Sequence, residues 1–206
     1  MNKYALIALA ALGLSLSAPV LAQDAGDATR GKGLSASCAA CHGADGNSVN
    51  PEWPKLAGQG EPYLYKQLVD YKEGRRENAL MAGQVANLSN QDMRDLAAYF
   101  ASQSSSAGSA DESVVALGEQ VYRGGNTATG VAACIACHGP NGQGNPAAMF
   151  PKVAAQHAKY SADQLGYFRD SSRANDAGRM MRNIARRMTD EEIEAVSQYM
   201  SGLTRN

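Results

Sequence analysis

The stretch Cys38-Ala39-Ala40-Cys41-His42-Gly43 decides the fold, because it returns 96 residues later as Cys134-Ile135-Ala136-Cys137-His138-Gly139. The similarity continues beyond this motif. Trp53-Pro54-Lys55-Leu56 is matched 97 residues later by Phe150-Pro151-Lys152-Val153. We therefore expect the chain to contain two copies of one domain.

A stretch of small polar residues separates the two copies. Residues 102–109 read Ser-Gln-Ser-Ser-Ser-Ala-Gly-Ser, a composition typical of a flexible linker. We place the first domain at residues 23–106 and the second at residues 107–206, with the linker at about 102–112.

Each copy has the sequence pattern of a helical domain. Ser89-x-x-Asp92 and Thr189-x-x-Glu192 have the spacing of a capping box, in which a hydroxyl and an acid satisfy the first amides of a helix. Apolar residues follow at i, i+3 and i+7, so each copy should end in an amphipathic helix. Residues 62–71 and 161–168 indicate a middle helix in each copy. Strand-type alternation is nearly absent, and the predicted fold class is all-α.

The first residues have the pattern of an export signal. Lys3 supplies positive charge, residues 5–20 are almost entirely apolar, and Val20-Leu21-Ala22 offers a cleavage site. The apolar run is short for a bilayer span, which needs roughly 20 residues. We therefore expect residues 1–22 to be removed as a signal peptide and the mature protein to lie in the periplasm. A retained membrane anchor is the alternative.

Charge and cysteine content narrow the function. Without Lys3 the chain has 18 basic and 20 acidic side chains, a net charge of −2. This balance argues against nucleic-acid binding, which requires a strongly basic face. Four cysteines in an exported protein would ordinarily form two disulfides, but their spacing here indicates another use.

Cys-x-x-Cys-His is the attachment motif for c-type haem. Two thiols separated by two residues reach the two vinyl groups on one porphyrin edge and form thioethers, while the adjacent histidine binds the iron. The sequence therefore predicts two haem c groups. The cysteines that bind them covalently are Cys38, Cys41, Cys134 and Cys137, and the iron-ligating histidines are His42 and His138.

Other uses of paired cysteines fit less well. A four-cysteine zinc site would place its pairs roughly 15 to 20 residues apart. A thioredoxin-like dithiol would lie in a βαβ unit, which the pattern lacks. A disulfide inside each pair would leave both histidines without a role.

A methionine is the predicted sixth ligand of each iron, because a thioether opposite histidine gives a saturated iron with a raised reduction potential, as in cytochromes c. Met81 lies eight residues before Ser89, and Met181 lies eight before Thr189. Met180 is one residue out of phase and is the alternative to Met181. A five-coordinate or bis-histidine iron also remains open.

The remaining histidine and methionines are assigned other roles. His157 corresponds to Gly60 of the first copy, so we expect it at the surface or at a haem edge and not on iron. Four methionines are interpreted as packing residues: Met93, Met149, Met188 and Met200.

Together these motifs resemble the di-haem cytochromes c4, a tandem form of the class I cytochromes c, over essentially the whole mature sequence. The shared features include residues 54–59, which read Pro-Lys-Leu-Ala-Gly-Gln, and their counterpart at residues 151–156. The resemblance implies two tandem cytochrome c folds, each enclosing one haem, with the haem edges close. It also implies an electron carrier and not an enzyme.

The resemblance implies a hydrogen bond behind each histidine. The carbonyls of Pro54 and Pro151 would accept the Nδ1 protons of His42 and His138, and such bonds fix the ring and tune the iron.

Three further positions are interpreted by the same resemblance. Trp53 and Phe150 would pack either on the haem or in an ordinary core. Gln84 stands where a second methionine often follows in the family, which leaves Met81 as the candidate in that segment.

As to function, the resemblance implies a periplasmic carrier that exchanges electrons with a terminal oxidase or a cytochrome reductase complex. Peripheral membrane association is compatible with that role. The alternative is a cytochrome subunit of a larger dehydrogenase complex such as a flavocytochrome. A haem enzyme needs an open iron and usually a distal acid or base, whereas both copies offer a methionine and no obvious distal histidine.

Four arginines gather around Met181. We hypothesise that some pair with haem propionates and that the others steer an acidic redox partner; the alternative is a solvated face. They are Arg179, Arg182, Arg186 and Arg187.

Overall fold

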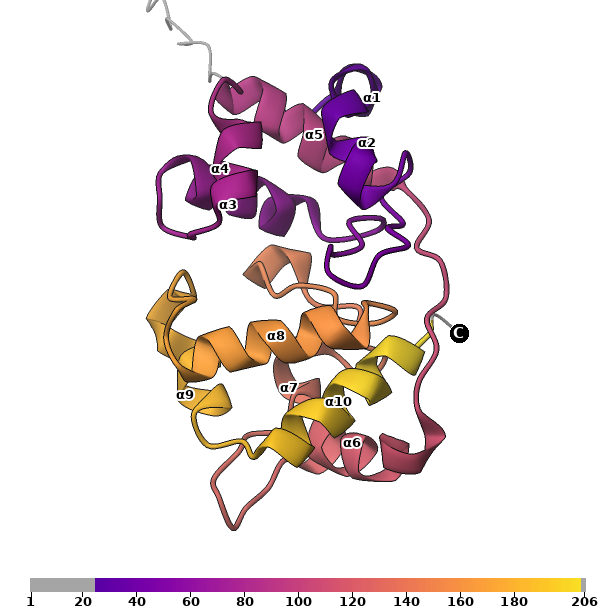
Figure 1. Ribbon diagram of the computed structural model, residues 1–206, viewed down its shortest axis with the longest axis vertical. Coiled ribbons are helices and arrows are strands. Elements are labelled where there is room, and N and C mark those ends of the chain that lie inside the picture. Colours follow the sequence, from indigo (N-terminus) through magenta and orange to yellow (C-terminus); the bar gives the residue numbers. More distant parts are fainter. Residues whose placement is uncertain (1–24, 205–206) are drawn as a thin grey trace, which may run out of the picture.

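The protein consists of two helical halves joined by an extended connection (Figure 1). The structure is a computed structural model that describes residues 25–204, so the predicted signal segment lies outside the described residues. Within these residues the only β-structure is two isolated bridges, Asn126–Val131 and Asn145–Phe150. The predicted all-α fold class is therefore confirmed.

The described part of the first half contains five helices. They are α1 (Ala28–Leu34), α2 (Ala36–His42), α3 (Glu61–Lys72), α4 (Ala79–Val85) and α5 (Asn90–Ser102). The described part of the second half contains α6 (Glu112–Gly124), α7 (Ile135–His138), η1 (Pro146–Ala148), α8 (Ala158–Arg169), η2 (Ala177–Arg179), α9 (Met180–Ala185) and α10 (Asp190–Gly202). The order of the α-helices thus repeats, as the sequence predicts, and the second half also has two short 3-10 helices, η1 and η2.

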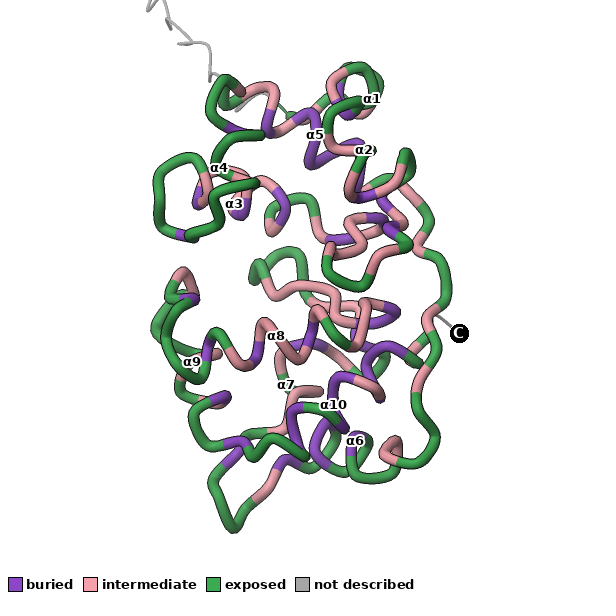
Figure 2. The backbone as a smooth tube through the Cα atoms, viewed as in Figure 1, coloured by how far each residue is buried: buried purple, intermediate pink, exposed green. Residues whose placement is uncertain are grey.

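The last helix of each half contributes more buried residues to the core than any other helix of that half. Both predicted capping boxes are present, at the start of α5 and of α10. Buried residues follow both helices (purple in Figure 2). Apolar residues on the predicted faces include Met93, Leu96 and Phe100 in α5 and Ile193, Val196 and Met200 in α10.

A glycine contact sets how the first helix of each half crosses the last. A Cβ atom on Gly31 of α1 would lie 2.0 Å from the carbonyl oxygen of Asp95 in α5. A Cβ atom on Gly118 of α6 would lie 2.1 Å from the carbonyl oxygen of Ala195 in α10. Only glycine allows the backbones to approach so closely.

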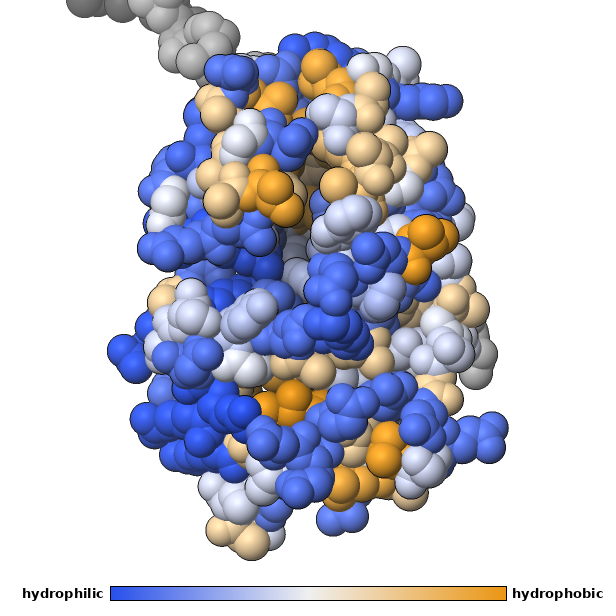
Figure 3. Space-filling model, viewed as in Figure 1, coloured by the Kyte–Doolittle hydropathy of each residue, from blue (hydrophilic) through white to orange (hydrophobic). Residues whose placement is uncertain are grey.

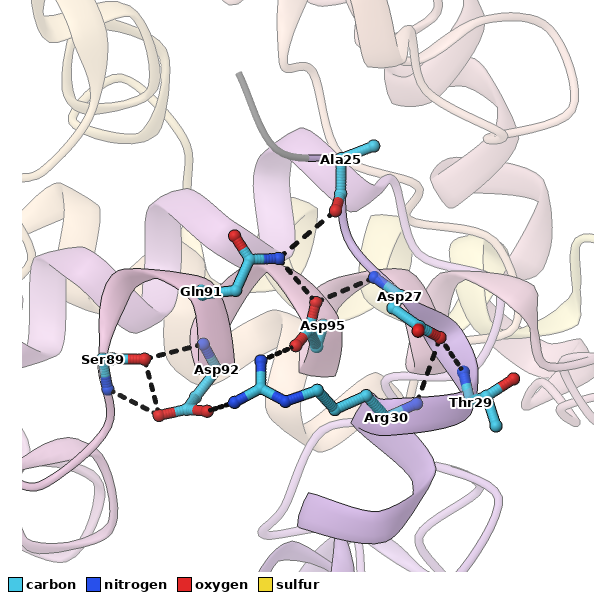
Figure 4. Close-up of polar contacts among 8 residues, drawn as sticks. All are labelled: Ala25, Asp27, Thr29, Arg30, Ser89, Gln91, Asp92 and Asp95. Atoms are coloured by element: carbon cyan, nitrogen blue, oxygen red, sulfur yellow. Dashed lines mark hydrogen bonds and ion pairs between the residues drawn. The ribbon is translucent and has the colours of Figure 1, made fainter. Parts of the chain in front are cut away.

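The first half also has a polar clamp that ties α1 to α5 (Figure 4). The buried carboxylate of Asp95 accepts the backbone N–H of Asp27 at 2.8 Å. It also pairs with Arg30, whose guanidinium reaches Asp92 of the capping box as well. The equivalent position in the second half is Ala195, so this clamp belongs to the first half.

Polar side chains of α3 and α8 join the two halves. Arg76, just after α3, donates to Gln164 Oε1 of α8 at 2.8 Å. Arg173, at the equivalent position after α8, donates to Gln67 Oε1 of α3 at 3.2 Å. The interface therefore has an approximate two-fold symmetry. Each arginine also donates to a tyrosine of the opposite half, Tyr160 and Tyr63 respectively.

Two candidate haem sites

The first Cys-x-x-Cys-His motif occupies the C-terminal part of α2. Cys38 and Cys41 are free thiols and are partly buried. His42 is the last residue of α2, and Gly43 ends the helix with a φ of +81°. Burial raises the pKa of Cys38. One helical stretch therefore presents both thiols and the imidazole.

His42 is held in the form that binds metal. Its Nδ1 lies 2.9 Å from the carbonyl oxygen of Pro54. A carbonyl can only accept, so the ring proton is on Nδ1 and Nε2 keeps its lone pair. Burial lowers the pKa of His42, which favours the neutral ring. The hydrogen bond predicted for Pro54 is confirmed.

The second motif repeats this arrangement around α7. Cys134 precedes the helix and His138 ends it. Nδ1 of His138 donates to the carbonyl oxygen of Pro151 at 2.8 Å, which confirms the second predicted bond. Burial lowers the pKa of His138 and raises the pKa of Cys134 to about 11.

The two predicted methionine ligands lie on equivalent short helices. The backbone N–H of Met81 in α4 donates to the capping Asn78 at 3.0 Å, and its side chain is partly buried. In α9, Met181 packs against the apolar cluster of the second half, whereas Met180 is 42% exposed. Met181 is thus the inward-facing member of the pair, and its role as a ligand stays a prediction.

Three of the four methionines assigned to packing are buried: Met93, Met188 and Met200. The assignment of Met149 to packing is wrong, because its side chain is 48% exposed. Met149 follows η1 with a φ of +56°, at the surface loop closed by the Asn145–Phe150 bridge. Trp53 and Phe150 are half-buried.

His157 has a role that the sequence did not indicate. Its Nε2 donates to the carbonyl oxygen of Ser48 in the first half at 2.9 Å. It therefore links the two halves. Other interdomain residues also went unassigned, although Gln59 and Gln156 stand at equivalent places in the two copies. A glutamine repeated at the same position of both copies was the available signal.

The residues present fit covalently bound haem. Each half presents two free thiols and a neutral imidazole with a free Nε2. Among residues 25–204, no group of three or more His, Cys, Asp or Glu side chains is gathered to hold a metal ion. The fold and the sites define the class of tandem c-type cytochromes, with one haem c in each domain.

Comparisons with known proteins agree with this class. The cytochrome c family model matches residues 28–104 and 115–204. Cytochrome c4 from Pseudomonas aeruginosa is 50% identical over 98% of this chain and 100% of that protein. The crystal structure of reduced recombinant cytochrome c4 from Pseudomonas stutzeri matches with a TM-score of 0.85 at 48% identity, covering 87% of this chain and all of the other. A thiosulfate dehydrogenase electron acceptor from Stutzerimonas stutzeri is 36% identical over 81% of this chain and 78% of its own length.

The chain belongs to the cytochrome c family, and within it to the di-haem cytochrome c4 type. It is an electron carrier and not an enzyme, and its cofactors are two haem c groups.

Proposed function

We propose that this protein shuttles electrons in the periplasm to a terminal oxidase or another respiratory acceptor. In this proposal the thioether bonds to haem are made by Cys38, Cys41, Cys134 and Cys137, and the axial ligands are His42, Met81, His138 and Met181. The observation that carries the proposal is the orientation of the two histidines, whose Nδ1 atoms both donate to proline carbonyls.

Haem c supplies reversible one-electron chemistry when it is bound. The protein supplies the ligands and their orientation. The Pro54 and Pro151 carbonyls hold each imidazole with Nε2 free and in the neutral state. A methionine at the sixth position leaves no coordination site for a substrate, which suits electron transfer and not catalysis.

The periplasmic location rests on the N-terminal sequence pattern and on the motif. Covalent haem attachment through thiols suits an exported protein, and residues 1–22 have the pattern of a signal peptide. Within residues 25–204, none of the helices has the length and apolarity needed to cross a bilayer.

The surface over α9 supports docking of an acidic partner. This surface is hydrophilic in Figure 3, and Arg179 and Arg186 are exposed there. Arg182 instead pairs with Asp176 at 2.6 Å, and Arg187 donates to the carbonyl oxygen of Gly130 at 2.7 Å. Two of the four arginines therefore have structural roles, and the other two are available to steer a partner.

The equivalent helix of the first half has a different surface. Helix α4 has no charged residue, and Leu80, next to Met81, is 72% exposed. We propose that acceptor docking occurs at the α9 end. Charge reversal of Arg179 and Arg186 should slow electron transfer at low salt, with the difference shrinking as salt increases.

A dehydrogenase partner is the second candidate. The relative from Stutzerimonas stutzeri is named as the electron acceptor of thiosulfate dehydrogenase, which supports a role as the partner of such an enzyme. Stable co-purification of this chain with a catalytic subunit would favour that role over free shuttling.

Spectroscopy of the purified holoprotein tests the proposed sites. We expect two haems per chain by pyridine haemochrome assay and, in the oxidised protein, a long-wavelength band that reports thioether ligation at both irons. Ready binding of carbon monoxide to both reduced centres would contradict the proposed ligand set.

A further inference from the structure

One peptide group connects each predicted iron ligand to the opposite domain. The carbonyl oxygen of the Pro54–Lys55 peptide accepts the Nδ1 proton of His42 at 2.9 Å. The N–H of this same peptide donates to Oε1 of Gln156, in the second half, at 2.9 Å. His42 is therefore separated from a side chain of the other domain by a single peptide unit.

The second site has the mirror-image arrangement. The carbonyl oxygen of the Pro151–Lys152 peptide accepts from His138 at 2.8 Å. The N–H of that peptide donates to Oε1 of Gln59, in the first half, at 2.8 Å. The two connections cross, because each half supplies the glutamine for the site of the other half.

Both glutamine side chains are firmly oriented. Nε2 of Gln156 donates to the Lys55 carbonyl, and Nε2 of Gln59 donates to the Lys152 carbonyl, each at 2.9 Å. Each Oε1 also accepts the N–H of the residue that follows its own glutamine. Exchanging the amide oxygen and nitrogen would break all of these bonds, so the assigned orientation is the one that the contacts require.

We infer that Gln156 and Gln59 are positioning residues that each tune the reduction potential of the iron centre in the opposite domain. The inference rests on the proposed ligand roles of His42 and His138. When a peptide N–H donates a hydrogen bond to a glutamine oxygen, the peptide is polarised and its own carbonyl becomes a stronger acceptor. The carbonyl then draws the Nδ1 proton more strongly, and the imidazole becomes a better electron donor at Nε2.

The direction of the effect follows from this donation. A more electron-rich ligand stabilises ferric over ferrous iron, so each glutamine lowers the potential of the opposite centre. Because hydrogen bonds in a chain strengthen one another by about 10–30%, we expect removal of one glutamine to change the redox equilibrium constant about two- to fivefold. At 59 mV per tenfold change for one electron, this is a rise of about 20–40 mV.

The hydrogen-bond relay, which runs from a glutamine through the peptide group to the histidine, also links the packing of the two domains to the histidine ligands. The glutamine contacts exist only while the halves are packed together, so each of these two peptides exchanges its glutamine acceptor for water when the halves separate. The two centres are thereby adjusted together by one interface.

The test is a redox titration of the holoprotein with each haem assigned by NMR. We expect Gln156→Leu to raise the potential of the His42 centre and Gln59→Leu to raise that of the His138 centre. Gln156→Glu keeps an oxygen acceptor for the Lys55 N–H, so it should not raise the potential. If the glutamine acted only through packing, the Leu and Glu variants would shift the reduction potential in the same direction.

Gln164→Leu is the matched control, because Gln164 accepts an interdomain hydrogen bond from Arg76 and one from Arg173 of its own half but touches neither peptide. It should leave the His42 and His138 Nδ1–H resonances of the reduced protein in place, whereas Gln156→Leu should shift that of His42. An uncrossed pattern, in which each variant moves only its own domain, overturns the relay. If the glutamine variants bind two haems per chain but the histidine Nδ1–H resonances do not move, the relay is overturned and the proposed function stands. If the protein binds no haem, the proposed function itself is overturned.

Discussion

The sulfur proposed to bind the second iron belongs to one of two neighbouring methionines. Met181 packs inward and Met180 is exposed, although the two are neighbours in α9. We expect Met181→Ala to let carbon monoxide bind at one of the two reduced centres and to remove the thioether band of that centre, because the sixth position is opened. The measurement is the optical spectrum with and without carbon monoxide.

Met180→Ala is the matched control and should leave both spectra unchanged. Carbon monoxide binding in Met180→Ala but not in Met181→Ala would reverse the assignment. The repeat spacing alone favoured Met181, and the exposed fraction of Met180 points the same way.

Asp95 is the residue on which the clamp of the first half depends. Burial acts to raise its pKa, but hydrogen bonds from Asp27 and Gln91 and the charge of Arg30 hold the pKa below its ordinary value. Asp95→Ala removes these bonds, and we expect a loss of about 1–3 kcal/mol in the free energy of unfolding.

The effect of Asp95 on the free energy of unfolding should depend on pH. A carboxylate with a lowered pKa in the folded state stabilises the protein above its unfolded pKa, and that stabilisation is lost as the pH falls through the folded pKa. The difference between wild type and Asp95→Ala should therefore be full at neutral pH and shrink below about pH 4. Urea unfolding across this range measures it, and a difference that grows in acid would contradict the role.

The residues of the two Cys-x-x-Cys-His motifs were the part of the site that the sequence could predict. The cysteines, histidines and proline contacts follow from motif and resemblance, and both proline hydrogen bonds are present. The interdomain contact of His157 was not predictable, because it depends on how two copies meet in space and not on spacing along the chain.

Among the elements, the crossing of α1 over α5 depends on one glycine. A methyl group at Gly31 would collide with the backbone of Asp95, whereas nothing lies within 4 Å of the position a Cβ would take at Gly33 in the same helix. We expect Gly31→Ala to destabilise the first domain by about 1–3 kcal/mol through overpacking.

Gly33→Ala is the internal control for this helix. It should be neutral or stabilise by roughly 0.5–1 kcal/mol, because alanine favours the helix and has room. Urea unfolding followed by circular dichroism compares the two variants. Equal effects would show that helix propensity, and not the close crossing, determines the response.

The close contact at Gly31 explains why the pattern missed α1. The middle and last helices were predicted from capping boxes and apolar spacing, and they are present as α3, α5, α8 and α10. Helix α1 has the sequence ATRGKGL, which has no apolar periodicity, because its contact with α5 is made by a backbone and not by large side chains.

For the whole molecule, the interface combines buried charge with two-fold symmetry. Arg76 and Arg173 are buried, and they share both acceptors, Gln67 and Gln164. Burial alone would raise the pKa of Tyr63, but the two arginines lower it. A sequence pattern cannot predict such a network, because each side chain is polar and acquires its partner only from the opposite copy.

Shared acceptors make the two arginines interdependent. When one is removed, the glutamines still accept from the other, and the repulsion between two buried cations is relieved. When both are removed, the acceptors lose every arginine partner. We therefore expect the Arg76→Met, Arg173→Met double variant to lose more unfolding free energy than the sum of the single variants, by about 0.5–3 kcal/mol.

A double-mutant cycle by urea unfolding of the holoprotein measures this coupling. Arg94, which stacks on Tyr65 within the first half, provides the comparison, because it shares no acceptor with Arg173. Arg94→Met should combine additively with Arg173→Met. Additive behaviour of Arg76 and Arg173 would mean that each half keeps its own arginine independently, and the interface would then not act as one symmetric unit.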